Sequence, residues 1–452
     1  MNTPRNGVST ADGTSSLADP AVSDATSPAA VGPSLEDESA GPATATAGPP
    51  SEDGAGTSGA ADSGAASGRP GDGSATTGPA AGGSAGPLPE GAVAPGEPVV
   101  VSYVAGFSGP YGSIISEALN GLYAWLDEIN GQGGILGRPV VIKEVDHRES
   151  AAGGVSACKE VLSNGSHLAF LAIGIDAVIT ATDCLDRNGF PSLYFASAEP
   201  FYRRWRHSYS VTANAEDVGR ALASFVEHRL DGRRHPVGVI VLNGLQTKAT
   251  ADAFVDDAAA HGLDVVGIES VEFNQTSFVP ELQRLREAGA EIVTMFVTAE
   301  VLGILRDARA MRYQPEFTGM GYTFDFLAAA ARDLMSGVSG VRIYATIDSP
   351  AFPEFTRLAD KHGRRKRAFD GDHFFTYGYG LVIGRVLEAS APYTRASLFA
   401  GIESIENYDN QVDAPITWGP GDYIGTSAVF PVVCCRPDWA WKSLGPAAEQ
   451  FG

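Results

Sequence analysis

The chain has 452 residues, of which 44% are hydrophobic and 19% are charged, and its formal net charge at pH 7 is -22. The length predicts more than one folded lobe. The strong negative charge argues against a nucleic-acid-binding protein, because an acidic surface repels phosphate. No apolar run approaches the roughly 20 residues of a membrane-spanning helix, so we expect no membrane-embedded domain.

Residues 1–97 contain no Phe, Trp or Tyr and consist mostly of Gly, Ala, Ser, Thr and Pro. Such a segment cannot bury enough apolar surface to offset the entropy of ordering, so we predict a disordered linker. Two interpretations remain open: an extension without a function of its own, or a tether that holds a folded module away from a surface. Residues 1–13 show no apolar core of a signal peptide, so the sequence does not directly reveal the location.

From residue 98 onward, short β-branched runs alternate with stretches that carry apolar residues at helical spacing. The predicted strands are 98–105, 140–145, 168–173, 191–196, 237–242, 265–271, 292–297, 317–320, 341–346 and 426–433. The predicted helices are 113–130, 151–163, 178–187, 219–229, 247–261, 279–287, 301–311 and 374–389. This alternation is typical of parallel sheets covered on both faces. We therefore predict an α/β fold with two doubly wound parallel-sheet lobes.

In open parallel sheets, ligands bind beyond the carboxyl ends of the strands. The loops that follow predicted strands are therefore the candidate binding loops: 106–113, 174–177, 197–206, 243–247 and 319–325.

Several stretches resemble a known family. Phe107-Ser-Gly-Pro-Tyr-Gly112 is followed by Asp127-Glu-Ile-Asn130 and then by Gly-Gly-Ile-Leu-Gly-Arg at 133–138. Further matches lie at 173–174, 274–282, 374–379 and 416–420. Together they resemble the type I periplasmic solute-binding proteins, in particular the leucine/isoleucine/valine-binding receptors of ABC transporters.

The resemblance implies two lobes joined by a three-crossing hinge, with the ligand held between them. The first lobe would comprise 98–217 and the return segment 347–415. The second lobe would comprise 218–346 and the C-terminal segment 416–452. Closure of such lobes about a hinge is a common response to a ligand.

The sequence departs from the family where amino-acid binders hold their ligand. Ala198 stands where they typically carry a Thr, Thr247-Lys248 where they carry a Tyr-Gly pair, and Gly321 where a Glu captures the ammonium group. A buried charged ligand without partners is costly. We therefore expect an amide, a polyol, an aromatic or a cationic compound, and not a branched-chain amino acid.

The candidate ligand-binding residues are those of the candidate loops with aromatic, hydrogen-bonding or acidic side chains, together with neighbours that shape the loops. They are Phe107, Tyr111, Asp176, Ala177, Ser197, Ala198, Glu199, Asn243, Gln246, Thr247, Tyr322 and Thr323. Each has an ordinary loop or capping role as its alternative, and Asp176 in particular is placed to cap the helix that follows it.

Cys158 and Cys184 lie on consecutive predicted helices that flank one strand. Such helices can share a sheet face, so we predict a disulfide and with it an oxidising location, the alternative being two separate buried thiols. For Cys434 and Cys435 the pairing stays open, because a bridge between adjacent residues would be strained. The cysteines and histidines lack metal-ligand spacing, so we predict neither a metal nor a cofactor.

These features favour an extracytoplasmic receptor, in the periplasm or at the cell surface. It would act as a monomer and deliver a small ligand to an ABC-transporter permease. The alternative is a ligand-sensing module of similar fold that acts in regulation. An enzyme is not expected, because no nucleophile–base pair is evident.

Overall fold

The computed structural model describes residues 96–109, 112–172, 174–229, 234–320, 331–435 and 440–451. All but the last two residues of the predicted linker at 1–97 lie outside this part of the chain. Within it, none of the helices combines the length and the apolar character needed to cross a bilayer.

The first sheet is parallel and five-stranded. Its strands are β1 (Val99–Ala105), β2 (Val140–Asp146), β3 (Leu168–Leu171), β4 (Ser192–Tyr194) and β5 (Ser208–Ser210), in the order β2-β1-β3-β4-β5. The residues of β1 are almost all buried, alternately in two apolar clusters. A strand that faces helices on both sides needs such a continuous apolar run, which is why the sequence predicted it.

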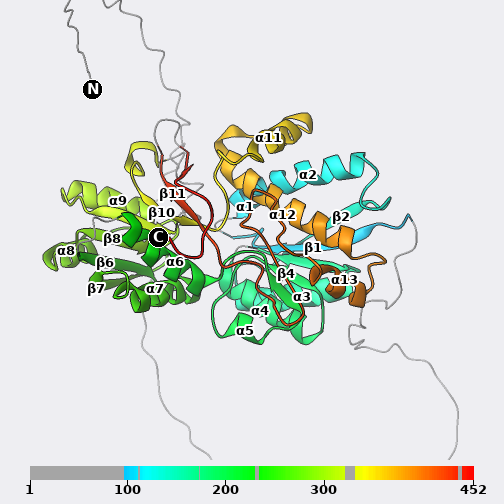
Figure 1. Cartoon of the computed structure of the whole chain (residues 1–452), viewed down its shortest axis with the longest axis horizontal. Coiled ribbons are helices and arrows are strands. Elements are labelled where there is room, and N and C mark those ends of the chain that lie inside the picture. Colours follow the sequence, from blue (N-terminus) through cyan, green and yellow to red (C-terminus); the bar gives the residue numbers. More distant parts are fainter. Residues whose placement is uncertain are drawn as a thin grey trace, which may run out of the picture. The chain divides into compact units, whose positions relative to one another are not determined.

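One face of this sheet carries helices from two distant parts of the sequence. They are α1 (Gly112–Ala118), α2 (Asn120–Gly131), α11 (Phe352–Lys361), α12 (Asp370–Ala389) and α13 (Arg395–Ile402), seen in cyan and orange in Figure 1. The predicted helix 113–130 is thus divided at Leu119. A Cβ on Gly121 would lie 1.6 Å from the His373 carbonyl oxygen, so the close packing of α2 on α12 requires glycine there.

The other face of the first sheet is covered by α3 (Ala151–Ser163) and α4 (Ile175–Arg187), which pack against each other. Cys158 of α3 and Cys184 of α4 are joined in a disulfide, with their Cα atoms 6.1 Å apart. The predicted pairing is therefore confirmed. Cys434 and Cys435 are adjacent in the sequence and both are buried.

The second sheet has seven strands, in the order β12-β11-β10-β9-β8-β6-β7. Its parallel strands are β6 (His235–Leu242), β7 (Leu263–Val271), β8 (Ile292–Phe296), β9 (Glu316–Met320) and β10 (Ser339–Arg342). The antiparallel strands β11 (Phe430–Val433) and β12 (Lys442–Ser443) extend one edge.

Helices cover both faces of this sheet as well. One face carries α6 (Ala215–Arg229) and α7 (Leu245–Ala258), and the other carries α8 (Val279–Glu287) and α9 (Val301–Ala310). Short helices lie at α5 (Phe201–Arg204), η2 (Arg332–Leu334) and η3 (Arg367–Phe369). The predicted fold class, two doubly wound parallel sheets, is confirmed.

Within the described residues the chain passes from one sheet to the other three times, at 211–214, at 343–351 and after residue 425. The last passage comes later than the expected boundary at 415/416, because Trp418 Nε1 and Gly425 N both donate to the Ser210 carbonyl oxygen beside β5. We therefore keep the two lobes as a proposal, with the C-terminal segment of the second lobe beginning near 426.

Candidate functional site

The loop after β2 closes over the loop after β1 at the carboxyl edge of the first sheet. Asp146 Oδ1 accepts hydrogen bonds from Phe107 N (3.0 Å) and Arg148 N (2.9 Å), and Asp146 Oδ2 accepts one from Ser108 Oγ. Burial tends to raise the pKa of Asp146, but these hydrogen bonds outweigh it and hold the pKa below its ordinary value. Asp146 is thus an ionised residue that orders both loops.

His147 fills the space between the loops that follow β1 and β3. It is fully buried, and its Nδ1 accepts a hydrogen bond from Glu149 N at 3.1 Å. A Cβ on Gly174 would lie 2.5 Å from His147 Cε1, and one on Gly106 would lie 3.2 Å from the same atom. The imidazole therefore requires glycine at 174 and packs tightly against Gly106.

Glu149 lies half-buried against the loop after β1. A Cβ on Gly109 would approach Glu149 Oε2 to 3.3 Å, and one on Gly106 would approach Glu149 Cγ to 2.6 Å. Burial raises the pKa of Glu149, and the Asp146 carboxylate adds to this rise. Sequence reasoning missed this loop, although the polar run 146–149 directly after a strand was a signal for it.

Three candidate ligand residues border the same edge, from the loop after β1 and from α4. The Phe107 ring is half-buried, and its centroid lies 6.4 Å from that of Tyr103. Asp176 is exposed and Ala177 is buried in the first turn of α4. Gly174 occupies the N-cap, with φ 106°, so the alternative role of Asp176 as the helix cap is wrong. The helix begins at Ile175, three residues earlier than predicted, which leaves the Asp176 side chain exposed to solvent.

The loop after β4 is fastened by its backbone to the first passage between the sheets. Ser197 N donates to Asn214 Oδ1 at 3.0 Å, and Ala215 N donates to the Ser197 carbonyl oxygen at 2.9 Å. Glu199 N donates to Glu216 Oε1 at 2.8 Å. The loop therefore holds the start of α6 in place.

The side chains of this loop differ in how far they are engaged. The Glu199 carboxylate accepts from Tyr202 Oη (3.1 Å) and pairs with Arg203, whose hydrogen bond lowers the pKa of Glu199. Ala198 is fully buried and offers no polar side-chain atom. Ser197 Oγ is buried and has no hydrogen-bond partner among the described residues. Of these three residues, Ser197 has a buried polar side-chain atom without a described partner.

The loop after β6 supplies the candidate residues of the second sheet. Thr247 Oγ1 donates to the Leu242 carbonyl oxygen at 2.8 Å, which uses its proton but leaves its oxygen able to accept. Asn243 is exposed and its Nδ2 donates to Glu272 Oε1 at 3.1 Å. Gln246 is 5% exposed. This loop thus presents amide and hydroxyl groups.

The candidates fall into two groups, one at each sheet. Phe107, Asp176, Ala177 and the loop 197–199 lie at the first sheet, and Asn243, Gln246 and Thr247 lie at the second. The helices α4 and α7, which carry Asp176 and Gln246, contact each other. The candidates Tyr111, Tyr322 and Thr323 lie outside the described residues.

An aromatic cluster that sequence reasoning did not identify lies at the second passage between the sheets. Tyr344 stacks on Phe375 of α12, with ring centroids 4.0 Å apart, and Phe375 meets Phe195 edge-on at 5.3 Å. The buried Arg342 guanidinium lies 4.0 Å from the Tyr344 ring centroid. These contacts fasten the passage to the first sheet, next to the end of β4.

No metal centre is evident in the part of the chain that the structure describes, where acidic, His and Cys side chains do not gather in groups of three. At both edges the described candidate side chains offer hydrogen-bonding and charged groups.

Comparison with known proteins gives the family. The family described as periplasmic binding protein matches residues 98–432. Leu/Ile/Val-binding protein homolog 3 from Brucella melitensis is 24% identical over 197 residues, which are 43% of this chain and 53% of the relative. The chain thus spans about half the length of the first curated relatives that it matches.

Solved structures share the fold at low sequence identity. A branched-chain amino acid ABC transporter protein from Thermus thermophilus with bound valine superposes with a TM-score of 0.67, at 15% identity, covering 78% of this chain and 96% of that one. A solute-binding protein from Rhodopseudomonas palustris in complex with 3,4-dihydroxybenzoic acid gives 0.66, at 14% identity, covering 78% and 97%. With most of its folded part matched, the chain belongs to the periplasmic binding protein family, whose members are solute-binding receptors and not enzymes.

Proposed function

We propose that this protein is the extracytoplasmic receptor of an ABC transporter, in the periplasm or at the cell surface, and that its two lobes close on a small polar ligand other than a branched-chain amino acid. Family membership supports the receptor role and the location. The receptor acts as a monomer and delivers its ligand to a permease.

The proposed ligand class rests on the negative charge at the carboxyl edge of the first sheet. The α-carboxylate of an amino acid needs hydrogen-bond donors, but Ala198 supplies none from its side chain, and the carboxylates of Glu149 and Asp176 border the same edge. Like charges in a site from which water is excluded repel strongly. Ligands that donate hydrogen bonds to carboxylates, such as amides, polyols and cations, fit this edge, and Phe107 adds an aromatic wall.

The bound compounds of the solved relatives, valine and 3,4-dihydroxybenzoic acid, show that the fold accommodates chemically different ligands. The ligand therefore has to be sought by screening a panel of amides, polyols, aromatic compounds and cations for a rise in melting temperature. We expect leucine, isoleucine and valine to give no shift. Micromolar binding of leucine would contradict the proposal.

Ser197→Ala tests whether the loop after β4 contacts the ligand found in that screen. The hydroxyl is buried and unpartnered within the described residues, so its removal costs little stability but removes a ligand hydrogen bond. We expect calorimetry to show binding weakened about tenfold. Thr294→Val, at another buried hydroxyl without a described partner but inside β8, is the matched control and should bind normally. Equal affinity of wild type and Ser197→Ala would remove Ser197 from the site.

A further inference from the structure

A cavity lies at one edge of the seven-stranded sheet, away from the candidate ligand loops. It measures about 460 Å³, within the range of small-molecule sites. Glu316 and Phe317 on its wall begin β9, and residues 336–338 directly precede β10. Because β9 and β10 are parallel, the cavity lies at their amino-terminal edge, whereas the candidate loops follow the carboxyl ends of strands.

The wall of the cavity has an apolar part and a polar part. Leu305, Tyr313, Phe317 and Leu334 supply apolar surface. The polar side chains are Arg309, Gln314, Glu316, Asp333 and Ser336. Polar side chains line this wall beside the apolar ones, so a ligand that fits combines polar groups with an apolar body.

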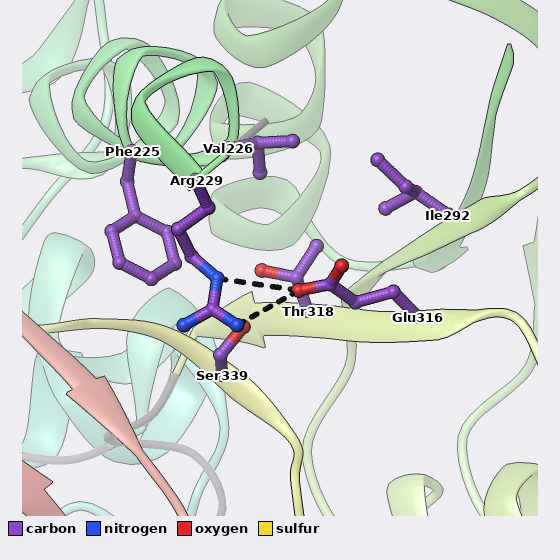
Figure 2. A pocket seen from close by; sticks show the side chains of 7 residues that line it. All are labelled: Phe225, Val226, Arg229, Ile292, Glu316, Thr318 and Ser339. Atoms are coloured by element: carbon purple, nitrogen blue, oxygen red, sulfur yellow. Dashed lines mark hydrogen bonds and ion pairs between the residues drawn. The ribbon is translucent and has the colours of Figure 1, made fainter. Parts of the chain in front are cut away.

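The wall carries one arginine, Arg309, and two carboxylates, Glu316 and Asp333. Glu316 is paired with Arg229 of α6 at 3.1 Å, as Figure 2 shows. Asp333 also interacts within the protein. Arg309, in the last turn of α9, is exposed and forms no ion pair with any described residue. A guanidinium group binds a carboxylate through two parallel hydrogen bonds.

The wall is held in place before any ligand arrives. Tyr313 Oη donates to the Ala290 carbonyl oxygen at 2.8 Å, which fixes the ring. Gly337 N donates to the Cys434 carbonyl oxygen at 2.7 Å, and Cys434 N donates to the Val338 carbonyl oxygen at 2.8 Å. A pre-organised site loses little entropy when it binds.

We infer that this cavity is a second binding site, for a small organic carboxylate with an apolar or aromatic body, whose carboxylate pairs with Arg309 while its body packs on Tyr313, Phe317 and Leu334. The site is separate from the proposed transport ligand site and does not depend on it.

Benzoate and its neutral counterpart benzamide are suitable probes, followed by NMR on the full ¹⁵N-labelled chain. We expect benzoate to shift the backbone amides of Gln314 and Gly337, and benzamide to bind more weakly. Arg309→Gln should raise the benzoate dissociation constant at these amides about tenfold or more. The exposed Arg312 does not line the cavity, so Arg312→Gln is the matched control and should bind as wild type does.

Three outcomes would overturn the inference: no shift at Gln314 and Gly337, equal binding of benzoate and benzamide, or equal benzoate affinity in Arg309→Gln and wild type. Shifts at the Ser197 amide report on the candidate loops instead. Shifts confined to that amide would contradict the second site while leaving the proposed receptor function intact.

Discussion

Asp413 is a carboxyl group buried where the second passage between the sheets meets α12. It is 1% exposed, and Asn410 Nδ2 donates to its Oδ2 at 2.7 Å. Its backbone pairs with that of Tyr344, and a Cβ on Gly378 would lie 3.3 Å from Asp413 Oδ2. Burial raises the pKa of Asp413 from its ordinary value of 3.8 to about 7, although the hydrogen bond from Asn410 acts in the opposite direction.

This raised pKa makes the stability of the protein depend on pH around neutrality. Between pH 3.8 and about pH 7, Asp413 keeps its proton in the folded chain but has released it in the unfolded chain. The free energy of unfolding therefore falls as the pH rises through this window and levels off above about pH 7. Between pH 5 and pH 8 the loss attributable to Asp413 is about 3 kcal/mol, at 1.36 kcal/mol for each pH unit below the folded pKa.

Urea denaturation of wild type and Asp413→Asn between pH 5 and pH 8 measures this loss. The amide does not titrate, so the stability of the variant relative to wild type should rise by about 3 kcal/mol over that range. Buried histidines such as His373 titrate in both proteins and cancel in the difference. Asp409→Asn, at an exposed carboxylate nearby, should follow wild type. Parallel pH profiles of wild type and Asp413→Asn would refute the reasoning.

Two further predictions concern packing and the disulfide. Gly121→Ala should lower the free energy of unfolding by about 1–3 kcal/mol or more, because the new Cβ meets the His373 carbonyl oxygen. Gly131→Ala is the control and should not lower it, because there is open space around Gly131 at the end of α2. Equal urea midpoints of the two variants would contradict this prediction. Replacing Cys158 and Cys184 together by Ser should cost about 3 kcal/mol, and a reductant should lower the melting temperature of wild type but not of the double variant.

Elements with strong apolar periodicity were predictable from the sequence. The buried strand β1 and helices such as α3 were found because their apolar spacing repeats over a whole element. The division of the first helix at Leu119 was not found, because Leu119 is itself buried and continues the apolar pattern across the break. The disulfide was predictable because two consecutive helices share one sheet face.

The candidate site was harder to predict from the sequence than the fold, because its contacts join segments that are far apart in the chain. Asp146 and Glu149 contact the loop after β1 because β1 and β2 are neighbours in the sheet. The order of strands in a sheet cannot be predicted from a local sequence pattern. The Ser197 backbone N–H donates a hydrogen bond to the Asn214 side chain, and the sequence of one loop cannot reveal this contact. The burial of Asp413 likewise depends on where the second passage meets α12.

The central claim, a receptor whose lobes close on a small ligand, is tested most directly by small-angle X-ray scattering with and without the ligand found in the thermal screen. A ligand that contacts both sheets binds the closed state more tightly and shifts the population toward it. We predict a smaller radius of gyration when the ligand is bound. Saturation with that ligand, shown by calorimetry, without any change in the radius of gyration would contradict the claim.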